Sequence, residues 1–245
     1  MPSLIIRALC VVLVGLVGCS HATGLQSAGP PDECAKPTTL TEAAACLDLP
    51  AVRHAIEIDH ADPNQRDADG VPSIAIGLLT RSVYWHKADE RAVDVARYLL
   101  AHGADPNARF SHGGHQGITA LHLAAYDGDV RLARLLVDSG AEVNAARDDG
   151  STPLHAAASC DFRLSCDDCG TSGARPTLEL LVAHGGDLRK KTSAGRDVLS
   201  TVPTPCADHP ELCEPERLAS ANWYSGTCKQ TYAWITRTLA ALPAR

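Results

Sequence analysis

The sequence lacks a second long apolar run: after its first 18 residues, nothing approaches the roughly 20 apolar residues that a membrane-spanning helix needs. It also lacks an excess of basic residues, since 22 Lys and Arg stand against 29 Asp and Glu, giving a net charge of −7. This balance argues against nucleic-acid binding. The chain contains no H-E-x-x-H, no G-x-S-x-G and no phosphate-binding glycine loop. We therefore expect no catalysis, no bound metal and no cofactor.

The first residues are typical of an export signal. Arg7 is followed by an uncharged, mostly apolar run that ends at Gly18, which is too short to cross a bilayer. Leu16-Val17-Gly18-Cys19 resembles a bacterial lipobox, which implies a signal peptide over residues 1–18 and a lipid on Cys19. The alternative is ordinary cleavage after Ala22.

These features predict a protein of the bacterial cell envelope. The lipobox resemblance implies an outer-membrane anchor facing the periplasm, whereas cleavage after Ala22 gives a soluble periplasmic protein. Residues 19–38, which are rich in small, Gly and Pro residues, are expected to form a flexible tether between the lipid and the fold.

An internal repeat carries the clearest structural signal. GITALHLAA, which starts at Gly117, and GSTPLHAAA, which starts at Gly150, align without gaps at a spacing of 33 residues. The first continues as YDGDVRLARLLVDSGAEVNA, with apolar residues at helical spacing. Period and motif resemble the ankyrin family. The resemblance implies an all-α solenoid of helix-turn-helix units joined by β-hairpin loops, in which stacking of neighbouring units supplies the stability.

Weaker copies extend the repeat in both directions. The end of the unit recurs as HADPN at His60, HGADPN at His102 and HGGDLR at His184. We call the segments between these tails and the next glycine the fingers; they comprise residues 65–70, 108–117, 145–150 and 190–195. The second finger is four residues longer than the others. We expect an ankyrin domain over residues 39–245 with five units: a cap at 39–66, repeats near 67–109, 110–147 and 148–190, and a divergent last unit.

Eight cysteines remain when Cys10 and Cys19 are set aside, and an even number in an exported chain predicts disulfides. We expect bonds between the insert at 160–169 and residues 206–228, and a bond between Cys34 and Cys46. The alternative is a thiol- or metal-dependent enzyme site in that insert. The cysteines concerned are Cys34, Cys46, Cys160, Cys166, Cys169, Cys206, Cys213 and Cys228.

His122 and His155 are expected to be structural, because they are separated by one repeat and this position in ankyrin units hydrogen-bonds neighbouring backbone. Residues that packing of the repeats does not require are instead candidates for binding a partner. Large aromatic residues and arginine in loops are the usual anchors of interfaces. Trp85 and Phe110 have the alternative of folding back onto their own loops. The candidates are Tyr84, Trp85, Arg109, Phe110, His112, His115 and Arg147.

The ankyrin resemblance implies a scaffold that binds another protein. We expect the partner to be a second envelope or exported protein that the chain inhibits, as immunity proteins do, or supports as an accessory. The chain itself is expected to be a monomer or part of a heterocomplex. A structural envelope spacer is a further alternative.

Overall fold

The computed structural model describes residue 34 and residues 36–84, 90–159, 174–202 and 226–241. Contacts divide the chain into two units, Met1–Ala35 and Lys36–Arg245, and every helix and strand discussed here belongs to the second. The expected signal peptide, Cys19 and the first part of the tether lie outside the described residues. Within the described ranges, no helix combines the length and apolar character that crossing a membrane requires.

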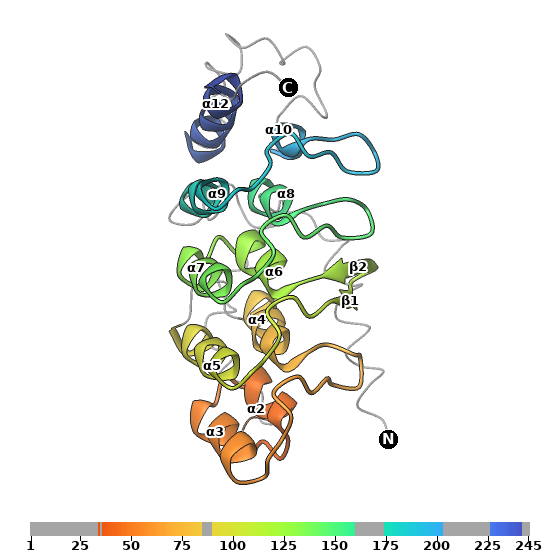
Figure 1. The fold of residues 1–245 in the computed structure, drawn as a ribbon, viewed down its shortest axis with the longest axis vertical. Helices are drawn as coiled ribbons and strands as arrows, with labels where there is room; N and C mark the ends of the chain where they lie inside the picture. The colour runs from red at the N-terminus through yellow and green to blue at the C-terminus, as the bar shows by residue number, and fades with distance from the viewer. Residues whose placement is uncertain (1–33, 35, 85–89, 160–173, 203–225, 242–245) are drawn as a thin grey trace, which may run out of the picture. The chain divides into compact units, whose positions relative to one another are not determined.

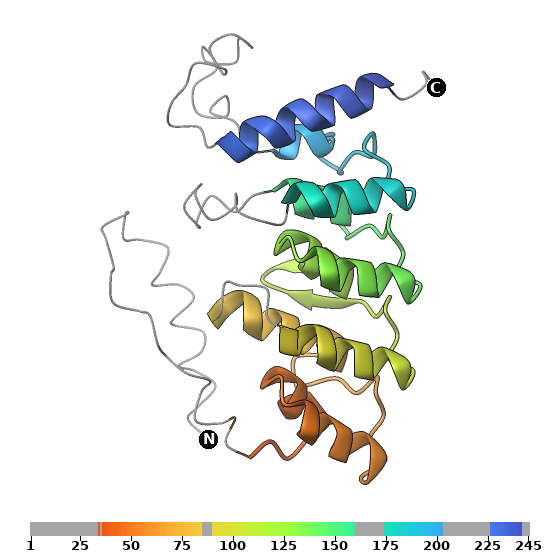
Figure 2. The same cartoon turned by 90° about the vertical axis from the view of Figure 1, so that its left-hand side faces the viewer.

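The second unit is a stack of helix pairs, as Figures 1 and 2 show. One row of helices, which we call the inner row, packs in the order α2, α4, α6, α8 and α10, and an outer row packs as α3, α5, α7 and α9. The fingers extend from the inner row on the side away from the outer row (Figure 1). The bounds are α2 Leu40–Ala45, α3 Leu49–Glu57, α4 Ser73–Tyr84, α5 Glu90–Ala101, β1 Phe110–His112, β2 His115–Ile118, α6 Ala120–Tyr126, α7 Val130–Asp138, α8 Pro153–Ala158, α9 Ala174–Ala183, α10 Val198–Thr201 and α12 Gly226–Ala241.

The α6–α7 pair shows why the sequence folds this way. Asp129 stands at the N-cap of α7, and its carboxylate accepts hydrogen bonds from two backbone N–H groups of the first turn. Gly140 follows the helix with a φ of +92°, a left-handed conformation that residues with a side chain adopt at a cost. Each element therefore begins and ends at residues suited to that position.

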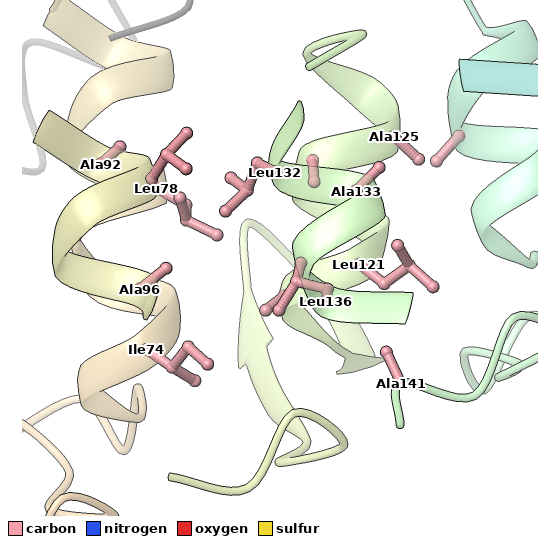
Figure 3. Packing of buried hydrophobic residues seen from close by; sticks show 14 of the residues in the cluster. Ile74, Leu78, Ala92, Ala96, Leu121, Ala125, Leu132, Ala133, Leu136 and Ala141 are labelled. Carbon is pink, nitrogen blue, oxygen red and sulfur yellow. The ribbon is translucent and has the colours of Figure 1, made fainter. Parts of the chain in front are cut away.

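The core lies between successive pairs (Figure 3). Leu132 and Leu136 of α7 point toward the α4–α5 pair, whereas Leu121 and Ala125 of α6 point toward the following unit. All four side chains are fully buried. Because each helix pair hides its apolar residues only against its neighbours, stacking rather than any single unit stabilises the fold.

A ladder of asparagines joins the units along the stack. The amide of Asn107 donates to the backbone oxygen of Gly140 over 3.0 Å and accepts from the N–H of Glu142 over 2.8 Å. Asn64 makes the equivalent pair of bonds one unit earlier, and Asn144 makes it one unit later. Arg189 occupies this position in the last repeat. Each asparagine thus joins the end of its own unit to the segment that follows the outer helix of the next unit.

The second finger is the one that forms a regular hairpin. Its strands β1 and β2 pair antiparallel, with Phe110 opposite Ile118 and His112 opposite His115, and an irregularity in register lies between the two pairs. Gly113 and Gly114 make the turn with φ values of +58° and +82°. Positive φ at both central residues matches a type I′ turn, whose twist suits a two-residue hairpin. The four extra residues therefore form an extension of this finger.

The structure describes part of each end of the stack. The cap contains the two short helices α2 and α3, and Thr39 and Glu42 form a capping box at the start of α2. In the last unit, Ile235 of α12 is fully buried and Leu239 packs against the core. The side chains of Tyr232 and Leu242 lie outside the described residues.

The inner helix of the first repeat is longer than that of the second. Helix α4 has 12 residues whereas its equivalent α6 has 7. The run from Leu79 to Tyr84 contains no glycine or proline, so nothing in it stops the helix.

The structure tests few of the predicted disulfides. Cys34 and Cys46 are disulfide-bonded cysteines, and their pairing with each other stays a prediction. The side chains of the remaining cysteines, Cys160, Cys166, Cys169, Cys206, Cys213 and Cys228, lie outside the described residues. The staple between the insert at 160–169 and residues 206–228 therefore also stays a prediction.

Candidate functional site

Partly exposed apolar side chains gather on the inner row beside the hairpin. Ile76 and Leu79 of α4 and Leu123 of α6 are half-buried and pack against the small core at the base of the hairpin. Tyr126, one turn beyond Leu123, keeps 40% of its surface exposed. We call these four residues the inner patch. They occupy equivalent positions of two successive units, because Leu123 and Tyr126 follow Ile76 and Leu79 by 47 residues, the spacing of Gly70 and Gly117.

The inner patch stops at α8. The residues of α8 that match Leu123 and Tyr126 one repeat later are Ala156, which is buried, and Ser159. The surface thus changes from large apolar side chains on α4 and α6 to small ones on α8.

Phe110 supports the hairpin from inside. It is 5% exposed and packs with Val71, Ala75 and Ile118 in a cluster separate from the main core. The expectation that Phe110 is an exposed anchor for a partner is therefore wrong, and the alternative, in which it folds back, is what the structure shows. Burial of this ring stabilises the base of the finger and leaves the tip projecting.

The tip of the hairpin carries the two histidines. His112 and His115 are cross-strand partners on either side of the glycine turn, and both are exposed. Cross-strand partners share a face of a hairpin, so both side chains are on the same face of the tip.

His122 and His155 are structural, as expected. The backbone N–H of Thr119 donates to Nδ1 of His122 over 3.2 Å, and Nε2 lies 3.2 Å from the backbone oxygen of Ser151. A carbonyl oxygen only accepts, so Nε2 carries the proton and Nδ1 is the acceptor. His155 repeats this arrangement with Thr152 and the backbone oxygen of Arg196. Each ring therefore ties an inner helix to the following finger.

Burial sets the protonation state of these rings. Desolvation, reinforced by the nearby charge of Arg147, lowers the pKa of His122 to about 4, and burial also lowers the pKa of His155. Neutral imidazole is consequently the form present at physiological pH. His122 and His155 are each only 2% exposed, so neither ring can contact a partner.

Arg66 and Arg109 connect neighbouring fingers. A guanidinium nitrogen of Arg66 donates to the backbone oxygen of Arg109 over 2.9 Å, and Arg109 donates in turn to the backbone oxygen of Ala146 over 2.7 Å. Arg109, proposed from sequence as a binding residue, thus has a structural contact that holds the second finger to the third.

Arg147 lies in a different setting. It lines a small open pocket of about 230 Å³ between the hairpin and the third finger, together with Gly114, His115, Gln116, Asp148 and Asp149. Its side chain is half-buried, and desolvation lowers its pKa. Its Nε is buried and makes no hydrogen bond to the described residues. Tyr126 of the inner patch is near enough to Arg147 to raise the pKa of the guanidinium slightly, against the larger effect of burial.

The two carboxylates of the pocket differ. One oxygen of Asp149 accepts the backbone N–H of Ser151 over 2.8 Å. Although burial raises the pKa of Asp149, hydrogen bonds from Ser151 and the charge of Arg147 hold it below its usual value. Asp148 is exposed, and its own backbone N–H donates to the oxygen of Gln116. Arg147 carries a formal positive charge, and Asp148 and Asp149 each carry a formal negative charge.

The structure thus brings together His112, His115 and Arg147 of the predicted binding residues. Phe110 and Arg109 serve the finger itself, while the side chain of Tyr84 and all of Trp85 lie outside the described residues. The inner patch was missed. Its signal was present in the sequence as apolar residues three apart at matching places in two units.

Within the ranges that the structure describes, no three His, Cys, Asp or Glu side chains are placed to hold a metal ion. The cysteine insert, where the alternative thiol or metal site was expected, lies outside those ranges. What the described surface offers is an apolar area, a projecting hairpin and a charged pocket, which is the make-up of a recognition surface.

Comparison with known proteins identifies the repeats. Residues 85–192 match the family model described as "Ankyrin repeats (3 copies)", so the chain contains ankyrin repeats. It is 31% identical over 153 residues to potassium channel KOR1 of Oryza sativa subsp. japonica, covering 61% of this chain and 15% of the channel. It is 42% identical over 82 residues to inactive serine/threonine-protein kinase TEX14 of Mus musculus, covering 34% of this chain and 5% of that protein.

A third similar protein is delta-latroinsectotoxin-Lt1a of Latrodectus tredecimguttatus, 33% identical over 105 residues, with 42% of this chain and 7% of the toxin covered. The match spans at most 15% of the length of these relatives. The ankyrin repeats of this chain indicate a role in protein–protein interaction.

Proposed function

We propose that this chain is a binding scaffold that recognises another protein through the inner patch and the hairpin beside it, without catalysing a reaction. The observation that carries the proposal is the inner patch, whose apolar side chains remain partly exposed although the other large apolar side chains described on α4 and α6, Ile74, Leu78 and Leu121, are buried. Exposed apolar area rimmed by polar groups is the usual mark of an interaction surface.

Rigidity supports the same function. The asparagine ladder, the two buried histidines and the arginines of the first two fingers hold successive units together. A surface that is already ordered loses little conformational entropy when a partner binds, so more of the contact energy is retained as affinity.

The proposal extends to the place of action and the consequence of binding. The apolar leader and Leu16-Val17-Gly18-Cys19 support export and lipidation at Cys19, with cleavage after Ala22 as the alternative. The partner is then a second envelope or exported protein, whose activity the chain inhibits or supports. Replacing Cys19 with Ser and following the protein between membrane and soluble fractions tests the anchor; an unchanged membrane fraction would contradict it.

Affinity capture tests the binding surface. The full chain carries a C-terminal tag and is recovered from extracts of its own cells as wild type, as Tyr126→Glu, and as Arg134→Glu, a control on the exposed side of the outer helix α7. We expect Tyr126→Glu to reduce recovery of the partner about tenfold or more, because an anchor residue contributes over 1 kcal/mol. Arg134→Glu should leave recovery unchanged. Equal recovery with both variants, at equal thermal stability, would reject this surface.

A further inference from the structure

His112 and His115 stand at the tip of the hairpin in a fixed relation to each other. They are cross-strand partners, and Gly113 and Gly114 make the turn between them. Directly opposed residues of an antiparallel pair have Cβ atoms about 4.5–5.5 Å apart on one face. Two imidazoles that bind one Zn²⁺ place their ligating nitrogens about 2.0–2.1 Å from the ion, so these nitrogens lie within about 4 Å of each other. Rings attached to neighbouring Cβ atoms reach this arrangement by rotation of their side chains alone.

Both rings are available to a metal ion. His112 and His115 are exposed, and within the part of the chain that the structure describes neither ring makes a hydrogen bond. His54, His102 and His184 differ, because Nδ1 of each lies 2.8–3.2 Å from an oxygen of the chain. A neutral imidazole with an unshared electron pair on one nitrogen is the commonest metal ligand in proteins.

The hairpin is ordered before any ion binds. Phe110 is buried at its base, and the guanidinium of Arg109 donates to the backbone oxygen of Ala146 over 2.7 Å. The backbone N–H of Asp148 donates to the oxygen of Gln116 over 3.2 Å, which joins the second strand to the third finger. Chelation at the tip therefore costs mainly the rotational freedom of two side chains.

The charges around the hairpin are balanced. Arg147, Asp148 and Asp149 line the pocket beside the tip. Arg109 adds a second positive charge, since a Cβ at Gly117 would lie 3.3 Å from its guanidinium nitrogen and 3.1 Å from a carboxylate oxygen of Asp148. Two formal positive charges thus face two formal negative charges. Affinity for a cation must come from the imidazole nitrogens, which late transition metals prefer and which Mg²⁺ and Ca²⁺ do not.

We propose that the hairpin tip binds one late transition-metal ion, such as Zn²⁺, through one ring nitrogen each of His112 and His115. Zn²⁺ usually takes four ligands, so two positions on the ion are left for water. In the described ranges no three His, Cys, Asp or Glu side chains are placed to hold an ion together. The ion is accordingly held by fewer protein ligands than a structural zinc and exchanges more readily. This site does not depend on whether the inner patch binds a protein.

Titration of the full chain with Zn²⁺ tests the site. The chain is purified through a tag that contains no histidine, and binding is measured by competition with a zinc-sensitive dye. We expect a saturable site whose affinity falls about tenfold or more in His112→Gln and in His115→Gln, because two linked ligands bind far more tightly than one. The double variant should be little weaker than either single variant. His54→Gln, which removes an exposed imidazole beside the carboxylate of Asp59, is the matched control and should leave the affinity unchanged.

NMR spectroscopy locates the ion. Zn²⁺ should shift the imidazole resonances of His112 and His115 together, and an excess of Mg²⁺ should not reverse the shifts because Mg²⁺ prefers oxygen ligands. The proposal would be overturned by the absence of saturable binding, by unchanged affinity in the double variant or by an equal loss of affinity in His54→Gln. A shift of only one of the two rings, or displacement of Zn²⁺ by Mg²⁺, would overturn it as well.

Discussion

Replacing Asn107 with Ala tests how much the asparagine ladder contributes to the stack. The change removes two hydrogen bonds, of 3.0 Å to Gly140 and 2.8 Å from Glu142. Each such bond contributes about 0.5–1.5 kcal/mol net. Both partner residues are exposed, so water replaces the lost bonds and no buried group is left unsatisfied. We therefore expect a loss of about 1–3 kcal/mol in the free energy of unfolding.

Urea denaturation followed by far-UV circular dichroism measures this loss. Asn107→Asp keeps an acceptor for the N–H of Glu142 but loses the donor to Gly140, so it should cost about half as much. Gln116→Ala removes an exposed amide from the same finger and is the matched control. The reasoning is refuted if Asn107→Ala is no more destabilising than Gln116→Ala, or if Asn107→Asp costs as much as Asn107→Ala.

Three further changes test other parts of the fold. Burial disfavours protonation of His122 in the folded state, where its pKa is about 4 against 6.5 in the unfolded chain. The free energy of unfolding should therefore fall as pH drops from about 6.5 to 4. NMR titration should place the pKa of His122 far below 6, and a pKa near 6.5 would contradict the buried geometry. Gly77→Ala puts a Cβ 2.6 Å from the backbone oxygen of Ala44, so denaturation should show a loss of about 1–3 kcal/mol, and an unchanged midpoint would be evidence against the close contact of α2 and α4. Leu136→Ala should cost about 2–5 kcal/mol and more than Leu135→Ala, because Leu136 is fully buried and Leu135 is half-buried; equal losses would contradict this packing.

Much of the fold could be predicted from the sequence because the repeat is periodic. GITALHLAA and GSTPLHAAA fixed the register of two units, and the recurring tails located the fingers around them. The extra length of the second finger was visible as four more residues before Gly117. That it forms a regular hairpin also follows from Gly113-Gly114, two residues suited to the turn.

The position of Phe110 could not be predicted in the same way. A shift of one residue in a strand moves a side chain to the opposite face, and the irregularity between Phe110 and His112 is a property of the folded hairpin. The sequence showed a rare aromatic residue in a long finger, which is equally consistent with an exposed anchor and with a buried support. Contact with Val71 and Ala75, about 40 residues earlier in the chain, decided the outcome.

The inner patch shows the limit of reading each unit alone. Tyr126 was seen only as part of a repeat motif, and Ile76 and Leu79 were not singled out. Their alignment across α4 and α6 becomes a surface only when the units stack, because stacking places equivalent positions side by side. Comparing equivalent positions between units, rather than looking for unusual residues within loops, would have found it.

Site-specific photo-crosslinking in living cells tests the central claim most directly. A photoreactive phenylalanine analogue at position 126 lies in the inner patch, and the same group at position 134 lies on the outer helix α7. The account predicts an adduct with one discrete protein from position 126 and none from position 134. Adducts of equal yield from both positions, or an adduct from position 134 alone, would contradict it.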